Sequence, residues 1–176
     1  FCNQHQATML PWKMLIVALF CCCIEAGATQ HRANALFPAA SSIKRGVTAA
    51  VNPTFISSIS DAHLLFEILM SGIQFESSGV FSVTDAELAS LQKTRNLDFI
   101  CEEIIPKKLT DILRLISGLS NHTGYLHQHD FERTVLTLVY TAHQMVSSAT
   151  EYQRDVWAES FVSLYKSIKK DLTLRN

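Results

Sequence analysis

The spacing of apolar residues predicts helices along most of the chain after residue 57. The two clearest patterns come last: one from Asp130 to about Ser148, and one that Thr150 opens and that runs to about Leu172. Both repeat apolar residues every three or four positions, which places them on one face of a helix. Because the linker between them is very short, the two helices should form an antiparallel hairpin.

Another helix is expected immediately after the irregular first part of the chain. Ser58 with Asp61 resembles a capping box and opens a helix that runs through Ile73. Phe66 and Met70 add apolar groups outside its main apolar face. Since a helix that is apolar on several faces is usually buried, this helix is expected to be central.

Capping residues and a proline delimit three further short helices, which begin at Thr84 and cover 97–105 and 111–119. Thr84 with Glu87 forms a full capping box. Pro106 ends the second helix, since it has no N–H group to donate, and Thr110 can cap the third. The stretch from Val80 to Val83 is the only strand-like segment, and a single strand cannot form a sheet.

Together these patterns predict an all-α protein. We expect a compact bundle of about five helices over residues 58–174, preceded by an irregular, extended arm over residues 29–57. The arm has no helical period and is rich in Ala, Ser and Thr with scattered Pro and Gly. Within it, Leu36-Phe37-Pro38 is expected to be able to dock on the bundle as an apolar anchor.

The amino terminus has the pattern of a targeting signal rather than of a folded element. Residues 14–24 form an unbroken apolar run of eleven, which is too short for a membrane span of about 20 residues. It fits the core of a signal peptide, since Lys13 precedes it and a small-x-small pattern ends at Ala28. We expect a signal peptide over residues 9–28, cleaved after Ala28, with residues 1–8 upstream of the initiator. The alternative is a buried helix at the start of a cytosolic domain.

Composition and charge indicate a globular domain and argue against one class of partner. The chain has 176 residues, of which 48% are hydrophobic and 18% charged, and its net charge is −1. These values are typical of one folded globular domain. No basic patch stands out, which argues against nucleic acid as a partner.

Cysteine use implies that the mature fold depends on its core alone. Four of the five cysteines lie in or before the leader, so only Cys101 remains after cleavage and no intrachain disulfide can form. A buried, inert thiol is the favoured interpretation of Cys101 because it follows two apolar residues. An intermolecular disulfide and a reactive thiol are the alternatives.

Two short motifs indicate modification of a secreted protein. Asn121-His122-Thr123 is an N-glycosylation sequon in a polar segment between two helices, where the acceptor Asn121 would be exposed. Lys44-Arg45 is a dibasic pair in the arm. It could be a convertase site, which would make residues 29–45 a propeptide, or an exposed pair that is never cut.

Motifs for catalysis are missing from the sequence. It holds no Gly-x-Ser-x-Gly elbow, no His-Glu-x-x-His and no glycine-rich phosphate loop. The paired carboxylates at Glu102-Glu103 and at 130–132 are expected to be solvated charges rather than an acid–base pair. We therefore predict no catalytic residue and no cofactor.

The best candidates for metal ligands are the three histidines near Asp130. Imidazoles and a carboxylate suit zinc or copper, and these are His122, His127 and His129. Asp130 has a better explanation as a helix cap, and a glycan on Asn121 would crowd His122. A polar loop of ordinary histidines is favoured, so no metal site is predicted.

Several motifs also resemble a known family. They are Trp12-Lys13-Met14-Leu15, Leu36-Phe37-Pro38-Ala39-Ala40, Glu87-Leu88-Ala89-Ser90-Leu91, Ile105-Pro106-Lys107, the specific run over 130–138, Tyr140-Thr141-Ala142, Trp157-Ala158 and Val162-Ser163-Leu164. On these residues the chain resembles the animal proteins called family with sequence similarity 180. The resemblance implies a secreted protein and carries over no functional residue.

The function expected from the sequence is that of a secreted, non-enzymatic protein that binds an unknown extracellular protein through a helical surface. A helical-cytokine-like ligand is one version of it. The alternative is an extracellular carrier of a lipid or small apolar ligand in the bundle core. A cavity of several hundred Å³ would favour the carrier. A filled core with an exposed apolar patch would favour partner binding.

Overall fold

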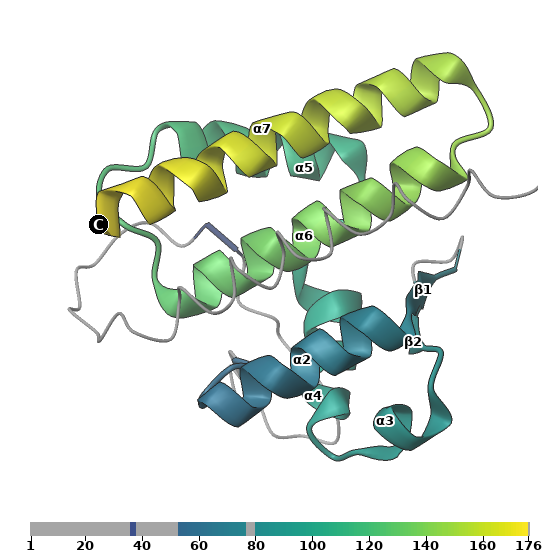
Figure 1. Cartoon of the computed structure of the whole chain (residues 1–176). Helices are drawn as coiled ribbons and strands as arrows, with labels where there is room; N and C mark the ends of the chain where they lie inside the picture. Colours follow the sequence, from purple (N-terminus) through teal and green to yellow (C-terminus); the bar gives the residue numbers. More distant parts are fainter. Residues whose placement is uncertain (1–35, 38–52, 77–79, 176) are drawn as a thin grey trace, which may run out of the picture.

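The computed structural model describes residues 36–37, 53–76 and 80–175, which fold as helices with one small sheet (Figure 1). The elements in chain order are α2 (Ile59–Ser71), β1 (Ile73–Phe75), β2 (Phe81–Val83), α3 (Ala86–Ser90), α4 (Thr94–Phe99), the π-helical turn η1 (Ile100–Ile104), α5 (Leu109–Ser120), α6 (Gln128–Ser147) and α7 (Glu151–Arg175). The prediction of a compact all-α fold is confirmed.

The two carboxy-terminal helices form the predicted hairpin. Figure 1 shows α6 and α7 side by side and antiparallel, with α5 against α7. The Thr150 hydroxyl accepts a hydrogen bond from the Gln153 N–H at 3.2 Å, which confirms it as the cap. Leu164 and Ile168 of α7 are fully buried in this interface, as their spacing predicted.

The central helix is α6, not α2. Every residue from Asp130 to Thr141 is buried, so this helix is covered on all faces. It can carry threonines there because their hydroxyls bond back to the helix: Thr134 donates to the Asp130 carbonyl at 2.6 Å and Thr137 to the Arg133 carbonyl at 2.7 Å. The expectation that α2 is central is wrong, because one face of α2 meets solvent.

The strand-like segment at Val80 to Val83 pairs with a second strand that the sequence did not predict. Gly72 ends α2 with φ 112°, a value that side chains disfavour, and the chain turns into β1. β1 then pairs with β2 in antiparallel register, with Ile73 opposite Val83. The helix therefore stops before Ile73, and the expectation of a lone strand is wrong.

Three of the predicted caps shift by one to three residues. The cap of α3 is Asp85, whose carboxylate accepts from two N–H groups at 2.9 and 3.0 Å, while the Thr84 N–H donates to the Gly72 carbonyl in the turn of the sheet. α5 begins after Lys108 rather than Thr110. The Ser58 cap is confirmed, since its hydroxyl accepts from the Asp61 N–H.

The third shifted cap lies at the start of α6. His127 occupies the cap position, so Asp130 stands inside the first turn instead of before it. A carboxylate there still faces the positive end of the helix dipole. The helix expected over 97–105 begins earlier, at Thr94, and ends in η1, where the Ile105 N–H reaches the Ile100 carbonyl just before Pro106.

The predicted apolar anchor is confirmed for Leu36 and Phe37, whereas Pro38 lies outside the described residues. Phe37 is buried in the core, and Leu36 is partly buried against it. The Arg133 guanidinium lies over the Phe37 ring at 5.9 Å. Phe55 and Ile56, at the end of the arm, are also buried.

Candidate functional site

Among the residues singled out for modification, the structure describes only the sequon. Ala28, Lys44 and Arg45 lie outside the described residues. Asn121 is exposed at the carboxy-terminal end of α5, where it occupies the cap position, and Thr123 beside it is exposed too. An oligosaccharide transferase could therefore reach this side chain without unfolding a helix.

The loop histidines do not converge on one point. The His127 and His129 rings stack at 5.6 Å, and the His129 Nε2 lies 3.5 Å from the Asp130 carboxylate. His122 instead meets the Tyr125 carbonyl at 3.2 Å. Within the described part of the chain, no group of three or more His, Cys, Asp or Glu side chains is arranged to hold a metal ion.

Cys101 is a buried thiol. It lies in η1 with none of its surface exposed, and burial raises the pKa of this thiol well above its usual range. At neutral pH it is therefore protonated, and the thiolate is the nucleophilic form. These properties confirm the favoured interpretation, a packed thiol.

Lys107 provides an unusual polar group beside the core. Its ammonium nitrogen lies 4.6 Å from the Phe75 ring centre and 4.7 Å from that of Tyr140, and among the described residues it has no hydrogen-bond partner. His143 meets the edge of Phe75. Burial lowers the pKa of Lys107, an effect that the charges near it partly reverse. Cation–π contacts replace part of the lost hydration, so this cluster stabilises the small sheet against α6.

Glu132 is a buried carboxylate with a structural role that the sequence did not reveal. It is 2% exposed, and its two oxygens accept from the N–H groups of Phe55 and Ile56 at 2.8 and 2.9 Å. One helical turn earlier, Gln128 donates to the Ile56 carbonyl at 2.6 Å. The expectation that this carboxylate is solvated is wrong. Gln128 and Glu132 are four residues apart and therefore lie on the same face of α6. From this face both side chains bind backbone groups of the segment that precedes α2.

Asp130 and Asp171 are likewise buried rather than solvated. Asp171 of α7 accepts a hydrogen bond from the Leu126 N–H and pairs with Arg175 at 2.8 Å. Arg175 in turn donates to the Leu126 carbonyl at 2.8 Å. Because both backbone groups of Leu126 are satisfied by α7, this pair joins the end of the last helix to the loop before α6.

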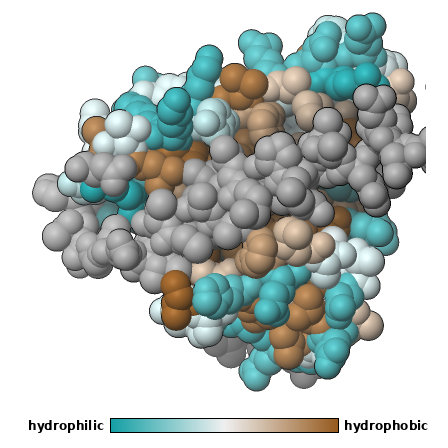
Figure 2. All heavy atoms as spheres, in the orientation of Figure 1, coloured by the Kyte–Doolittle hydropathy of each residue, from teal (hydrophilic) through white to brown (hydrophobic). Residues whose placement is uncertain are grey.

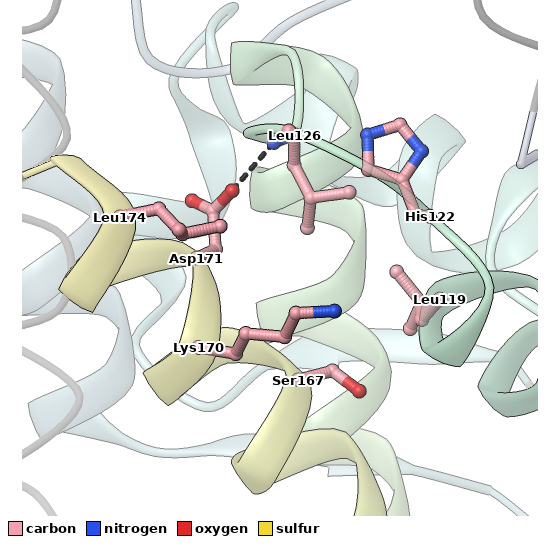
Figure 3. A pocket seen from close by; sticks show the side chains of 8 residues that line it. Leu119, His122, Leu126, Ser167, Lys170, Asp171 and Leu174 are labelled. Carbon is pink, nitrogen blue, oxygen red and sulfur yellow. Dashed lines mark hydrogen bonds between the residues drawn. The ribbon is translucent and has the colours of Figure 1, made fainter.

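A shallow pocket lies beside this contact (Figure 3). Its lining residues come from the end of α5, the following loop and α7, and Figure 3 shows the Lys170 side chain extending across it. The space open to water measures about 10 Å³. This volume holds about one water molecule, far less than the several hundred Å³ of a small-molecule site.

The outer side of α2 is the candidate interaction surface. Ile59 is 54% exposed and Met70 40% exposed, with exposed His63 and half-buried Phe66 between them. We call these four residues the α2 seam. Their spacing of four, three and four places them along one face of the helix. Figure 2 shows apolar groups bordered by hydrophilic ones over the part of the molecule where Figure 1 draws α2.

The opposite side of α2 is firmly attached, so the seam has a fixed geometry. Ala62, Leu65 and Ile68 are buried in the core. Asp61 pairs with Lys93 at 3.1 Å. Burial alone would raise the pKa of Asp61, but hydrogen bonds from Ser57 and Lys93 reverse this and hold it far below its usual range.

The residues of the seam are suited to non-covalent contact rather than to catalysis. Isoleucine, methionine and phenylalanine are residues that can supply apolar contact area, and a rigid helix presents them at low entropic cost. The signal in the sequence is the pair Phe66 and Met70, which are apolar but lie outside the main apolar face of this helix. The expectation that they make the helix central is wrong, since Met70 is exposed and Phe66 is only half-buried. Among the described residues, no helix combines the length and apolar character needed to cross a bilayer.

Two comparisons with known proteins point to the same family. A family model described as the FAM180 family matches residues 36–172, from the Phe37 anchor to the last turns of α7. The human Protein FAM180B is 25% identical over 169 residues, which cover 94% of this chain and 86% of that protein. No solved structure is significantly similar to the chain.

Proposed function

The chain belongs to the FAM180 family, and from this premise we propose that it is a secreted, non-enzymatic protein that binds a protein partner through the α2 seam. Nothing in the family description names an enzyme. Within the family, the motifs described above favour member A as the relative that the chain resembles most.

The seam is the observation that carries the proposal. A soluble domain normally turns polar groups outward on a surface helix. On α2, Ile59 and Met70 are exposed although the buried side of the same helix already holds Ala62, Leu65 and Ile68. Covering the exposed pair with a partner would remove further apolar area from water, which favours association.

Secretion and processing are part of the same proposal. The apolar run at 14–24 with cleavage after Ala28 supports export, and exposure of Asn121 supports glycosylation. Cleavage at Lys44-Arg45 would separate residues 29–45 from the rest of the chain. Because Phe37 is buried in the core, we expect the peptide that contains it to stay bound after such a cut.

The pocket that the described residues form does not support the carrier alternative. The pocket in Figure 3 has about 10 Å³ of space open to water, too little for an acyl chain or a steroid. Among the described residues, large apolar side chains such as Leu65 of α2 and Phe131 and Leu136 of α6 are fully buried in the interior.

Export is tested by expressing the full chain with a carboxy-terminal tag in animal cells. We expect the tag in the medium, an amino terminus just after Ala28, and a glycosidase-sensitive band that is absent in Asn121→Gln. A tagged protein that stays in the cytosol with residues 14–24 attached would contradict the secretory part of the proposal.

Partner binding is tested with the purified secreted protein on intact cells. We expect saturable binding that mild surface proteolysis abolishes and that Ile59→Gln with Met70→Gln weakens about tenfold, since each loses about 0.7 kcal/mol of apolar contact. Val146→Gln with Val162→Gln is the matched control, because both valines are exposed but lie outside the seam. Equal loss with both pairs, or no saturable binding, would refute partner binding through the seam.

A further inference from the structure

The half of the molecule that carries the seam is strongly acidic, although the whole chain is nearly neutral. Residues 53–105 hold eight acidic and two basic side chains, a net charge of −6. Residues 106–175 hold nine basic and seven acidic side chains, a net charge of +2. One of the two basic residues in the acidic half, Lys93, is already paired with Asp61.

These charges are arranged on the surface around one folded unit. α3 contacts both β2 and α4, and α4 continues into η1. Lys93, which precedes α4, pairs with Asp61 of α2 and so links these elements to the helix that carries the seam. Six of its carboxylates are on exposed residues: Glu67, Glu76, Asp85, Glu87, Glu102 and Glu103. Burial raises the pKa of Asp98 and the neighbouring Glu102 carboxylate raises it further, while Arg95 lowers it.

The seam itself has the geometry of a helix-binding surface. Its spacing of four, three and four residues is that of the alternating contact positions in paired helices. Glu67 projects from the exposed side of the same helix, beside the apolar positions. Apolar contact positions flanked by charges of one sign select partners of the opposite sign.

We propose that the seam docks a basic amphipathic helix of its protein partner, with apolar residues against Ile59, Phe66 and Met70 and lysine or arginine residues toward Glu67 and the other exposed carboxylates of this half. The inference rests on the proposed function and adds the chemistry of the partner to it. Apolar contact supplies the affinity, as in other helix-in-groove complexes. The field of the acidic half accelerates the encounter and rejects acidic partners.

The same charges argue against two other occupants. A second copy of the chain would place one half of charge −6 against another of equal charge, and like charges across an interface oppose association. An anionic membrane surface would repel this half for the same reason. A basic helix is the occupant that both the apolar seam and the charge around it favour.

The test uses the full secreted chain and two synthetic 18-residue helices as probes. One probe carries leucine at the contact positions and lysine elsewhere, and the other replaces every lysine by glutamate. We expect the lysine probe to bind at least about tenfold more tightly, because electrostatic steering changes association rates by about 10-fold or more. Raising the salt concentration should weaken the lysine probe and reduce this difference.

Charge variants locate the site on the protein. Glu67→Lys with Glu103→Lys should weaken the lysine probe about fivefold, a change of about 1 kcal/mol. Asp155→Lys with Glu159→Lys changes the charge equally on exposed positions of α7 and should change its affinity less than about twofold. Ile59→Gln with Met70→Gln should weaken both probes.

Four results would overturn the inference, and three of them come from the probes and the purified protein. These three are equal binding of the two probes, equal effects of the two charge variants, and dimerisation of the protein in sedimentation equilibrium that Ile59→Gln with Met70→Gln abolishes. If cell binding depends on Ile59 and Met70 but not on Glu67 and Glu103, the proposed function stands and the basic helix is refuted. Absence of any cell binding refutes the proposed function as well.

Discussion

At the scale of single residues, buried polar groups connect parts of the chain that lie far apart in sequence. Glu132 accepts two backbone hydrogen bonds from Phe55 and Ile56, and Asp171 with Arg175 holds Leu126. Burial raises the pKa of Glu132, and the two N–H groups oppose that rise by favouring the charged form. Each group is expensive to bury alone, so these contacts are made only in the native arrangement.

Glu132→Ala should reduce the free energy of unfolding by about 3 kcal/mol, since it leaves two buried N–H groups without acceptors. Urea denaturation measures the change, and amide exchange at Phe55 and Ile56 should accelerate selectively. Glu159→Ala on the exposed side of α7 is the control and should change stability by less than about 0.5 kcal/mol. Comparable losses in the two variants would contradict the role of Glu132.

Cys101 should resist alkylation in the native protein. Its side chain is fully buried and burial raises the pKa of the thiol, so iodoacetamide can react only after the chain opens. We expect no adduct by mass spectrometry in native buffer and complete modification in about 6 M guanidinium, since domains that are not hyperstable have midpoints below about 5 M. Rapid native labelling would show that the thiol is accessible.

At the scale of elements, Gly72 determines both where α2 ends and where the small sheet begins. Gly72 has φ 112°, and a Cβ atom built on it would lie 3.0 Å from the Thr84 hydroxyl. The Thr84 N–H donates to the Gly72 carbonyl, so α2 stops where β1 begins to pair with β2. A side chain at residue 72 would therefore disturb the helix end and the strand pair together.

Gly72→Ala should destabilise the protein by about 2 kcal/mol, about half from the positive φ and half from the close contact with Thr84. Gly124→Ala provides the matched control, because Gly124 has φ 89° but nothing within 4 Å of the added Cβ. Its cost should be about 1 kcal/mol. Thermal denaturation measures both, and equal costs would show that the contact with Thr84 adds nothing.

At the scale of the whole molecule, α6 holds two unlike halves together. Figure 1 shows α5 and α7 on one side of it, and α2, the small sheet, α3 and α4 on the other. On the second side, Tyr140 and His143 of α6 meet Phe75 of β1. Titration of His143 therefore acts at the junction between the halves.

His143→Gln should make stability less sensitive to acid. Burial lowers the pKa of His143 from its ordinary value of 6.5, so the unfolded chain binds this proton more readily than the folded chain. The free energy of unfolding contributed by this group is therefore lost as the pH falls below about 6.5.

Urea midpoints at pH 7 and pH 5 measure the effect. The raised pKa values of Glu132 and Asp98 act in the opposite direction, so the comparison is between variant and wild type. We expect a smaller loss in His143→Gln, whereas Gln144→Ala, which removes no titrating group, keeps the wild-type slope. An unchanged slope in His143→Gln would contradict the prediction.

Local patterns determined where most helices lie. Apolar spacing of three and four residues placed α5, α6 and α7, because it reflects the geometry of a single helix. The Ser58 and Thr150 caps followed from hydrogen bonds that reach only three residues. The apolar anchor at Leu36 and Phe37 also followed from the sequence, since two large apolar residues stand together in an arm that is rich in Ala, Ser and Thr.

Only the tertiary structure decided which faces are covered. The sequence shows that α2 has apolar residues on more than one face, but a helix does not specify how many neighbours will pack on it. For the same reason Glu132 and Asp171 look like ordinary surface carboxylates until distant backbone groups reach them. Solvent exposure and long-range hydrogen bonds depend on where all the elements meet, and these properties distinguish the α2 seam from the core.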